Sequence, residues 1–158
     1  MNNIEKLTHL NNLGCGPELD YFIATEFFNQ RPPKGYEQAS EYRWEQLIPD
    51  SYDDGSFARS FTVNVWPEPY SVNRSVCIEI IYCLYYHYRY FCEILFNGDE
   101  KCWDIKVYEG IVQYYNKENI DIIPLTRRYF PKLRVKETTF PLTLCRAAGV
   151  IFLENKNE

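Results

Sequence analysis

The sequence predicts an α+β fold, in which a small antiparallel sheet of about three to four strands packs with about three helices in a layered sandwich. An Asn97-Gly98 turn joins two segments of alternating hydrophobicity, which is typical of a β-hairpin. Apolar residues recur at helical spacing in residues 72–87 and 141–154. With 158 residues, 46% of them hydrophobic, the chain can bury one core. We therefore expect a single domain over residues 1–158, with insert-like segments at about 30–55 and 111–131.

The first predicted element is a helix in the segment PELDYFIATEFF. Pro17 suits the first turn, and apolar residues follow at helical spacing: Leu19, Phe22, Ile23 and Phe27. The helix must end before Pro32 and Pro33, because two prolines cannot continue it. We expect the residues before it to form a polar leader. The acidic, polar segment after it, up to Gly55, is expected to be a long surface connection.

A strand and a central helix should follow. Residues 57–66 alternate between apolar and polar side chains, as in a half-buried strand that Pro67 ends. The helix expected over about residues 72–87 can be capped by Ser71 or Asn73. Val76, Ile80 and Leu84 recur along it, so this helix should be largely buried.

The hairpin should pair Tyr90–Phe96 with Lys101–Tyr108. The turn between them fixes which side chains share a face, and we expect that face to be covered by the helices around residues 80 and 145. Its members are Cys92, Ile94, Phe96, Trp103, Ile105 and Val107.

The C-terminal part predicts one more strand and one more helix. Leu133 and Val135 alternate with basic residues, which indicates a fourth strand. Thr138 or Thr139 then caps a helix in PLTLCRAAGVIFLE, whose apolar stripe contains Leu144, Cys145, Ala148 and Phe152. Gly149 should let this helix approach a neighbour closely.

Three short motifs recur in a recognisable order along the chain. They are Leu19, Asp20 and Ala24 in the first helix; Pro69, Tyr70 and Ser71 before the second; and Pro141, Leu144, Cys145, Arg146, Ala147 and Ala148 in the last, with Trp103 in the hairpin. This order resembles the phage α/β/α sandwich domain family. The resemblance implies a phage or prophage origin and a helix and sheet sandwich, and it implies no catalytic residue.

Composition and motifs argue against several classes of function. The net charge of −5 disfavours a dedicated nucleic-acid binder. Only His9 and His87 are available as histidine ligands, and close-spaced Cys pairs are absent, so we expect no metal and no cofactor. No G-x-S-x-G, Walker or G-x-G-x-x-G pattern occurs. Without a membrane span or secretory signal in the sequence, we expect a cytoplasmic protein with reduced cysteines.

Two groups of residues are candidates for ligand binding. Arg127, Arg128 and Tyr129 open a basic segment that continues through Lys132, Arg134 and Lys136 and suits contact with phosphate and bases. The alternative interpretation is a strand with an ordinary charged outer face. Trp66, Tyr70 and Arg74 flank the start of the central helix and suit an anion or nucleotide. Helix capping explains the polar residues there equally well.

These observations favour a non-enzymatic binding protein of phage or mobile-element type. It would act on a host factor, with anti-defence inhibition as one form, or sequester a small anionic ligand such as a nucleotide. The surplus of tyrosine and tryptophan supports a contact surface. Two alternatives remain open, namely a small nucleotide- or phosphate-handling enzyme and a structural protein that forms homo-oligomers.

Overall fold

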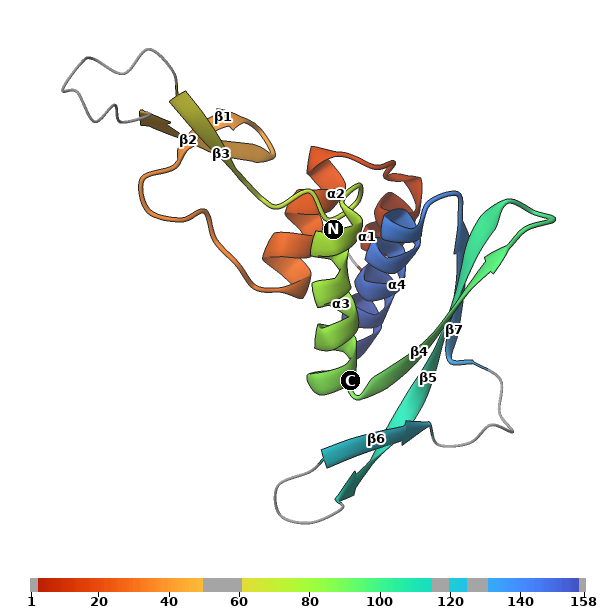
Figure 1. Cartoon of the computed structure of the whole chain (residues 1–158). Helices are drawn as coiled ribbons and strands as arrows, with labels where there is room; N and C mark the ends of the chain where they lie inside the picture. Colours follow the sequence, from red (N-terminus) through yellow and green to blue (C-terminus); the bar gives the residue numbers. More distant parts are fainter. Residues whose placement is uncertain (1–2, 50–60, 115–119, 125–130, 157–158) are drawn as a thin grey trace.

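The computed structural model confirms the α+β class and describes residues 3–49, 61–114, 120–124 and 131–156. Its helical elements are α1 (Asn3–Asn12), α2 (Pro17–Phe22), the π-helical turn η1 (Ile23–Phe27), α3 (Arg74–Tyr86) and α4 (Phe140–Asn155). Its strands are β1 (Glu37–Ser40), β2 (Arg43–Pro49), β3 (Phe61–Trp66), β4 (Tyr90–Asn97), β5 (Cys102–Tyr114), β6 (Ile120–Pro124) and β7 (Leu133–Glu137). Figure 1 shows helices gathered between two separate sheets.

The larger sheet contains the predicted hairpin. β5 pairs antiparallel with β4 and with β7, and its far end pairs with β6. The register places Ile94 opposite Ile105 and Phe96 opposite Trp103, as the turn sequence predicts. Ile105 and Val107 are fully buried beneath the helices. The prediction that the helices also cover Phe96 is wrong, because Phe96 is 55% exposed. Phe96 lies near the turn, on β4. In the described part of the sheet, β4 is an edge strand that pairs only with β5.

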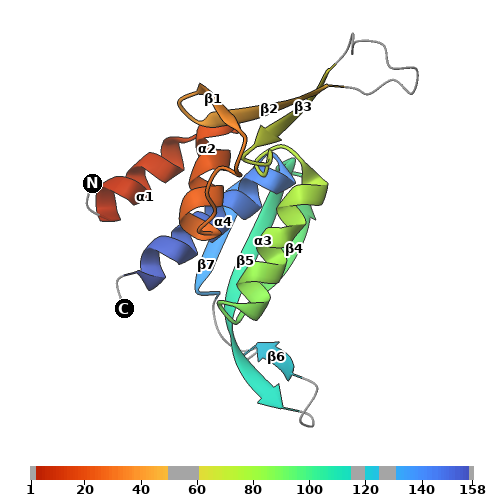
Figure 2. The same ribbon diagram turned by 90° about the vertical axis from the view of Figure 1, so that its left-hand side faces the viewer.

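Helix α4 is the centre of the molecule. It contacts α1, η1, α3, β5 and β7, and it is apolar on nearly every side, which is the pattern of a buried helix. Thr139 caps its start by accepting from the Leu142 N–H. Figure 2 shows α4 and α3 covering one face of the β4–β5–β7 sheet, with α1 and α2 on the far side of α4. The predicted sandwich therefore forms.

Helix α1 was not predicted, because its residues read as a polar leader. Two leucines nevertheless lie on one side of it: Leu7 is partly buried and Leu10 fully buried. Leu10 packs against Gly149 of α4, where a Cβ would lie 2.5 Å from Leu10 Cδ2. This close approach is the role predicted for Gly149. Arg146 of α4 completes the attachment by donating to the carbonyl oxygens of Asn11 and Leu13 at the end of α1.

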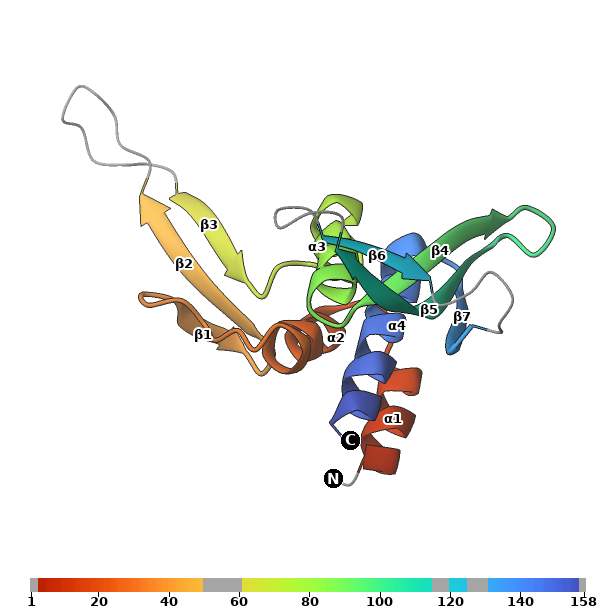
Figure 3. The same cartoon turned by 90° about the horizontal axis from the view of Figure 1, so that it is seen from below.

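Two strands of the second sheet lie within a segment that we expected to be a surface connection, which is a correction of that expectation. β1 and β2 occupy part of residues 30–55 and pair antiparallel, and β2 pairs in turn with β3. Of the strand predicted over residues 57–66, residues 61–66 are confirmed and residues 57–60 lie outside the described residues. Figure 3 shows β2 and β3 extending from the helices as an arm.

Aromatic side chains attach this arm to the helices. The Tyr21 ring of α2 stacks on Trp44 of β2 at 5.4 Å between ring centroids and meets the edge of Trp66 at 6.0 Å. Trp44 and Trp66 also contact each other at 5.3 Å. These contacts lie at the base of the arm, and its outer part extends away from the described helices (Figure 3).

Candidate functional site

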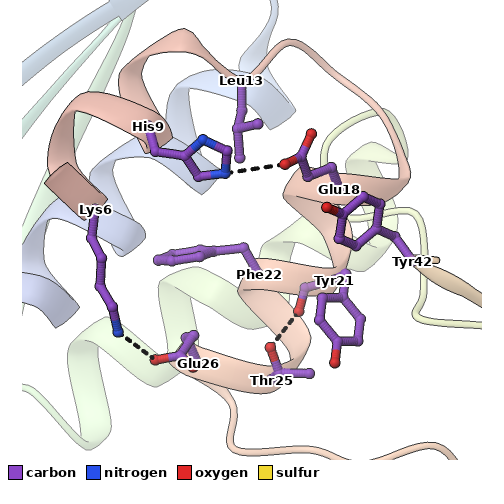
Figure 4. Close-up of a pocket in the computed structure, with 9 residues that line it drawn as sticks. All are labelled: Lys6, His9, Leu13, Glu18, Tyr21, Phe22, Thr25, Glu26 and Tyr42. Atoms are coloured by element: carbon purple, nitrogen blue, oxygen red, sulfur yellow. Dashed lines mark hydrogen bonds and ion pairs between the residues drawn. The ribbon is translucent and has the colours of Figure 1, made fainter. Parts of the chain in front are cut away.

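A pocket of about 210 Å³ lies between α1 and α2, with charged residues around an apolar floor (Figure 4). We call it the α1–α2 pocket. Its lining residues are Lys6, His9, Leu13, Glu18, Tyr21, Phe22, Thr25, Glu26 and Tyr42. Figure 4 shows the Phe22 ring lying between two ion pairs, with Tyr21 and Tyr42 on one side. Neither α1 nor the β1–β2 turn that supplies Tyr42 was predicted, so sequence reasoning missed this pocket.

The charges around the pocket are balanced. His9 Nε2 lies 3.1 Å from Glu18 Oε1, and Lys6 Nζ lies 3.9 Å from Glu26 Oε2. Lys156 also contacts the Glu26 carboxylate, at 3.1 Å. The Lys6 ammonium and the His9 imidazole therefore each face a carboxylate, and the pocket offers no surplus of positive charge for an anionic ligand.

Tyr42 separates this pocket from a second cavity. Hydrogen bonding to Glu41, reinforced by desolvation and by the charge of Glu18, raises the pKa of Tyr42 above its ordinary value. The second cavity, of about 260 Å³, is lined by Pro17, Asp20, Tyr42, Arg43, Val65, Pro67 and Pro69.

Asp20 is the one buried carboxylate in that second lining. Burial raises its pKa, while hydrogen bonds from Ser71 act in the opposite direction. Its Oδ1 accepts the Ser71 N–H at 2.6 Å, and Ser71 Oγ accepts the Gly16 N–H at 2.9 Å. Asp20 therefore has a structural role, because these bonds hold the turn before α3 against the start of α2.

A row of exposed tyrosines on α3 forms the second candidate surface. Ile78, Tyr82 and Tyr86 follow one another at intervals of four residues, so they share one face of the helix. We call them the tyrosine stripe. Tyr82 and Tyr86 are 61% and 65% exposed, and their rings stack at 6.4 Å. Tyr85 adds a third ring, edge-on to Tyr86 at 4.9 Å.

The ligand-binding residues predicted around the central helix do not share one surface. Trp66 and Tyr70 are buried, at 6% and 1% exposure. Tyr70 lies against Phe28, and burial raises its pKa to about 12. Arg74 is exposed, and its guanidinium lies over the rings of Trp103 and Phe140 at 5.4 and 5.6 Å. Asn73 caps α3 by accepting from the N–H groups of Ser75 and Val76.

The basic segment is described only in part. Arg127, Arg128 and Tyr129 lie outside the described residues. The three later cations lie on β7 or directly before it, and each pairs with a carboxylate: Lys132 with Glu109, Arg134 with Asp104, and Lys136 with Glu100. Their arrangement is that of a charged outer face of a sheet, and their positive charge is neutralised locally.

The described side chains offer little nucleophilic or metal-binding chemistry. Burial raises the pKa of Cys77 and Cys83 to about 11 and that of Cys92 to about 12. All six cysteines are free thiols. Among the residues that the structure places, no group of three or more His, Cys, Asp or Glu side chains could hold a metal ion. No helix in the described ranges is long and apolar enough to cross a membrane.

Comparison with known proteins found no matching family model, no matching curated protein and no matching solved structure. The resemblance to the phage α/β/α sandwich family therefore stays a prediction from sequence. What the structure adds is a physical role for the residues of its motifs. Asp20 binds Ser71, and Arg146 binds the end of α1, so both hold the helices together.

Proposed function

We propose that this chain is a non-enzymatic binding protein that acts on another protein through the tyrosine stripe of α3. The observation that carries the proposal is the exposure of Ile78, Tyr82 and Tyr86 in one row on a helix that the core holds rigidly. Tyrosine is enriched at interfaces because its ring buries a large area while its hydroxyl keeps a hydrogen bond.

The opposite side of α3 explains why the stripe can act as a fixed surface. Cys77, Ile80 and Leu84 on that side are fully buried against the core. A rigid helix loses little conformational entropy when a partner binds it, so more of the contact energy appears as affinity. If the resemblance to phage proteins holds, the partner is a host protein, and inhibition of a defence protein is one form of this function.

A comparison of purified variants tests the proposal. The Tyr82→Ala/Tyr86→Ala variant should lose a partner that the wild-type protein captures from host lysate. Leu95→Ala is the matched control, because Leu95 is an exposed apolar residue on β4. The captured partner is then purified, and its affinity for each variant is measured by calorimetry. Loss of at least tenfold in affinity for the tyrosine variant alone supports the proposal, whereas equal affinities overturn it.

The α1–α2 pocket favours a second candidate function, the sequestration of a small molecule. Its apolar floor and its balanced ion pairs suit an uncharged ring compound better than the anionic ligand expected from the sequence. Native mass spectrometry of the purified protein would reveal a ligand retained from the cell. Thr25→Met should fill the pocket and abolish retention, and retention by this variant would exclude the pocket as the site.

A further inference from the structure

The two edges of the β1–β2–β3 sheet differ in how they are protected against pairing with another strand. β1 has four residues, begins with a charged residue, Glu37, and has an irregular register between Gln38 and Ser40. Short strands, charges and bulges all discourage further pairing. β3 has six residues, FTVNVW, without a charge, a proline or a register shift against β2. Among the described strands, only β2 pairs with it.

The outer part of one face of the arm is apolar and exposed among the described residues. Leu47 of β2 lies opposite Val63 of β3, and Pro49 lies opposite Phe61. Leu47, Phe61 and Val63 are 64%, 57% and 45% exposed. A two- or three-stranded sheet without a layer against its apolar face gains little from hydrophobic burial. The β3 edge can therefore accept a further strand, and the exposed apolar face can bury more area against a partner.

The alternation of apolar and polar residues in β3 is kept when the strand is paired antiparallel with a second copy of itself. In antiparallel pairing centred on Val63, Phe61 lies opposite Val65 of the second copy and Val63 lies opposite its own equivalent. Thr62 lies opposite Asn64. Apolar residues thus meet apolar residues on one face, and polar residues meet on the other, as stable cross-strand pairs require. Such pairing has the two-fold symmetry of most homodimers.

We propose that two copies of this chain associate through antiparallel pairing of their β3 strands, centred on Val63. The two sheets become one six-stranded sheet, and the apolar faces containing Leu47, Phe61 and Val63 become continuous. A second copy fits this edge because every position from 61 to 65 meets a residue of its own chemical type. The proposal is independent of the tyrosine stripe, which lies on α3.

Light scattering coupled to gel filtration tests the association with the full-length chain. The wild-type protein should show a mass close to twice the 18.9 kDa of one chain at micromolar concentration. Val63→Lys should be monomeric, because it places two like charges opposite each other at the symmetry axis. Val72→Lys is the control at an exposed apolar residue outside the arm and should stay dimeric. A monomeric wild-type protein, or a dimeric Val63→Lys variant, overturns the proposal.

A crosslinking experiment tests the register and does not depend on the folding of the lysine variant. Residues directly opposite in an antiparallel pair have Cα atoms about 4.5–5.5 Å apart, within reach of a disulfide. In a Cys15→Ser background, which removes the exposed native thiol, Val63→Cys should therefore form a covalent dimer under mild oxidation that reducing agent reverses, whereas Val72→Cys should not. Equal crosslinking of the two variants would contradict pairing at Val63.

Discussion

The backbone N–H of Ser71 donates a 2.6 Å hydrogen bond to the carboxylate of Asp20, and both residues are buried. This bond joins α2 to the turn before α3 across 51 residues of sequence. Asp20→Ala removes the acceptor and leaves a buried N–H without a partner. We expect a loss of about 1–3 kcal/mol in the free energy of unfolding, measured by urea denaturation.

Ser71→Ala is the matched comparison for this network. It keeps the N–H that Asp20 accepts and removes only the Oγ that accepts from Gly16. The loss of stability should therefore be smaller than for Asp20→Ala. A larger loss for Ser71→Ala would show that the hydroxyl, and not the carboxylate, is the more important member.

Gly149→Ala should destabilise the protein although alanine favours helices. The new Cβ would lie 2.5 Å from Leu10 Cδ2 and 3.2 Å from Phe22 Cε1, so these two side chains would have to shift within the packed contact of α1 and α2 with α4. We expect a net loss of about 1–3 kcal/mol in thermal or urea unfolding. Gly14→Ala is the control, because a Cβ there has no atom within 4 Å. Unchanged stability of Gly149→Ala would contradict the close approach of α1 to α4.

The two hairpin residues Ile105 and Phe96 should respond differently to truncation. Ile105 is fully buried beneath the helices, so Ile105→Ala should cost about 2–5 kcal/mol of unfolding free energy. Phe96 is 55% exposed and contacts Trp103, so Phe96→Ala should cost no more than about 1 kcal/mol. Similar losses for both variants, measured by urea denaturation, would contradict the exposure of Phe96.

The ion pair of Asp104 and Arg134 predicts a pH dependence. Arg134 Nε lies 3.0 Å from Asp104 Oδ1, and this hydrogen bonding lowers the pKa of Asp104 in the folded protein. A carboxylate whose pKa is lowered by folding stabilises the fold at pH values above its unfolded pKa of about 3.9. This stabilisation is lost as the pH falls through the folded pKa. Asp104→Asn should therefore be less stable than wild type by about 1 kcal/mol at pH 7.

The difference between the same two proteins should shrink as the pH falls below the unfolded pKa of about 3.9, and it should vanish once the pH is below the lowered folded pKa of Asp104. Urea denaturation at pH 7, 5 and 3 measures this convergence. A difference between Asp104→Asn and wild type that stays constant over this range would exclude the ion pair as its cause.

Local patterns were sufficient to predict much of the fold. The Asn97-Gly98 turn fixed the register of β4 and β5, and the position of the proline and threonine residues gave the start of α4. The predicted helix from Pro17 is present, although its second half winds as a π-helix, with the Phe28 N–H bonded to the Ile23 carbonyl. These features depend on neighbours within a few residues, which a single sequence contains.

The elements that the sequence analysis did not predict depend on contacts between segments that are distant in the sequence. α1 has few apolar residues, and its burial results from Leu10 meeting Gly149. β1 is polar and β2 mixes polar with exposed apolar residues, and both strands are held by the Tyr21–Trp44 stack and by pairing with β3. The α1–α2 pocket is built from these elements, so its residues had no common signal in the sequence. Arg127, Arg128 and Tyr129 lie outside the described residues, and their binding role stays a prediction.

The distribution of the thiols offers a route to labelling the molecule. Cys15 is exposed in the turn between α1 and α2, whereas the five other thiols are buried or half-buried. The raised pKa of these five keeps the reactive thiolate scarce at neutral pH. A maleimide dye should therefore attach selectively to Cys15 in the unmodified chain. Cys15 lies in the turn between Leu13 and Glu18, which both line the α1–α2 pocket, so the emission of a fluorophore at that position should report occupancy of the pocket.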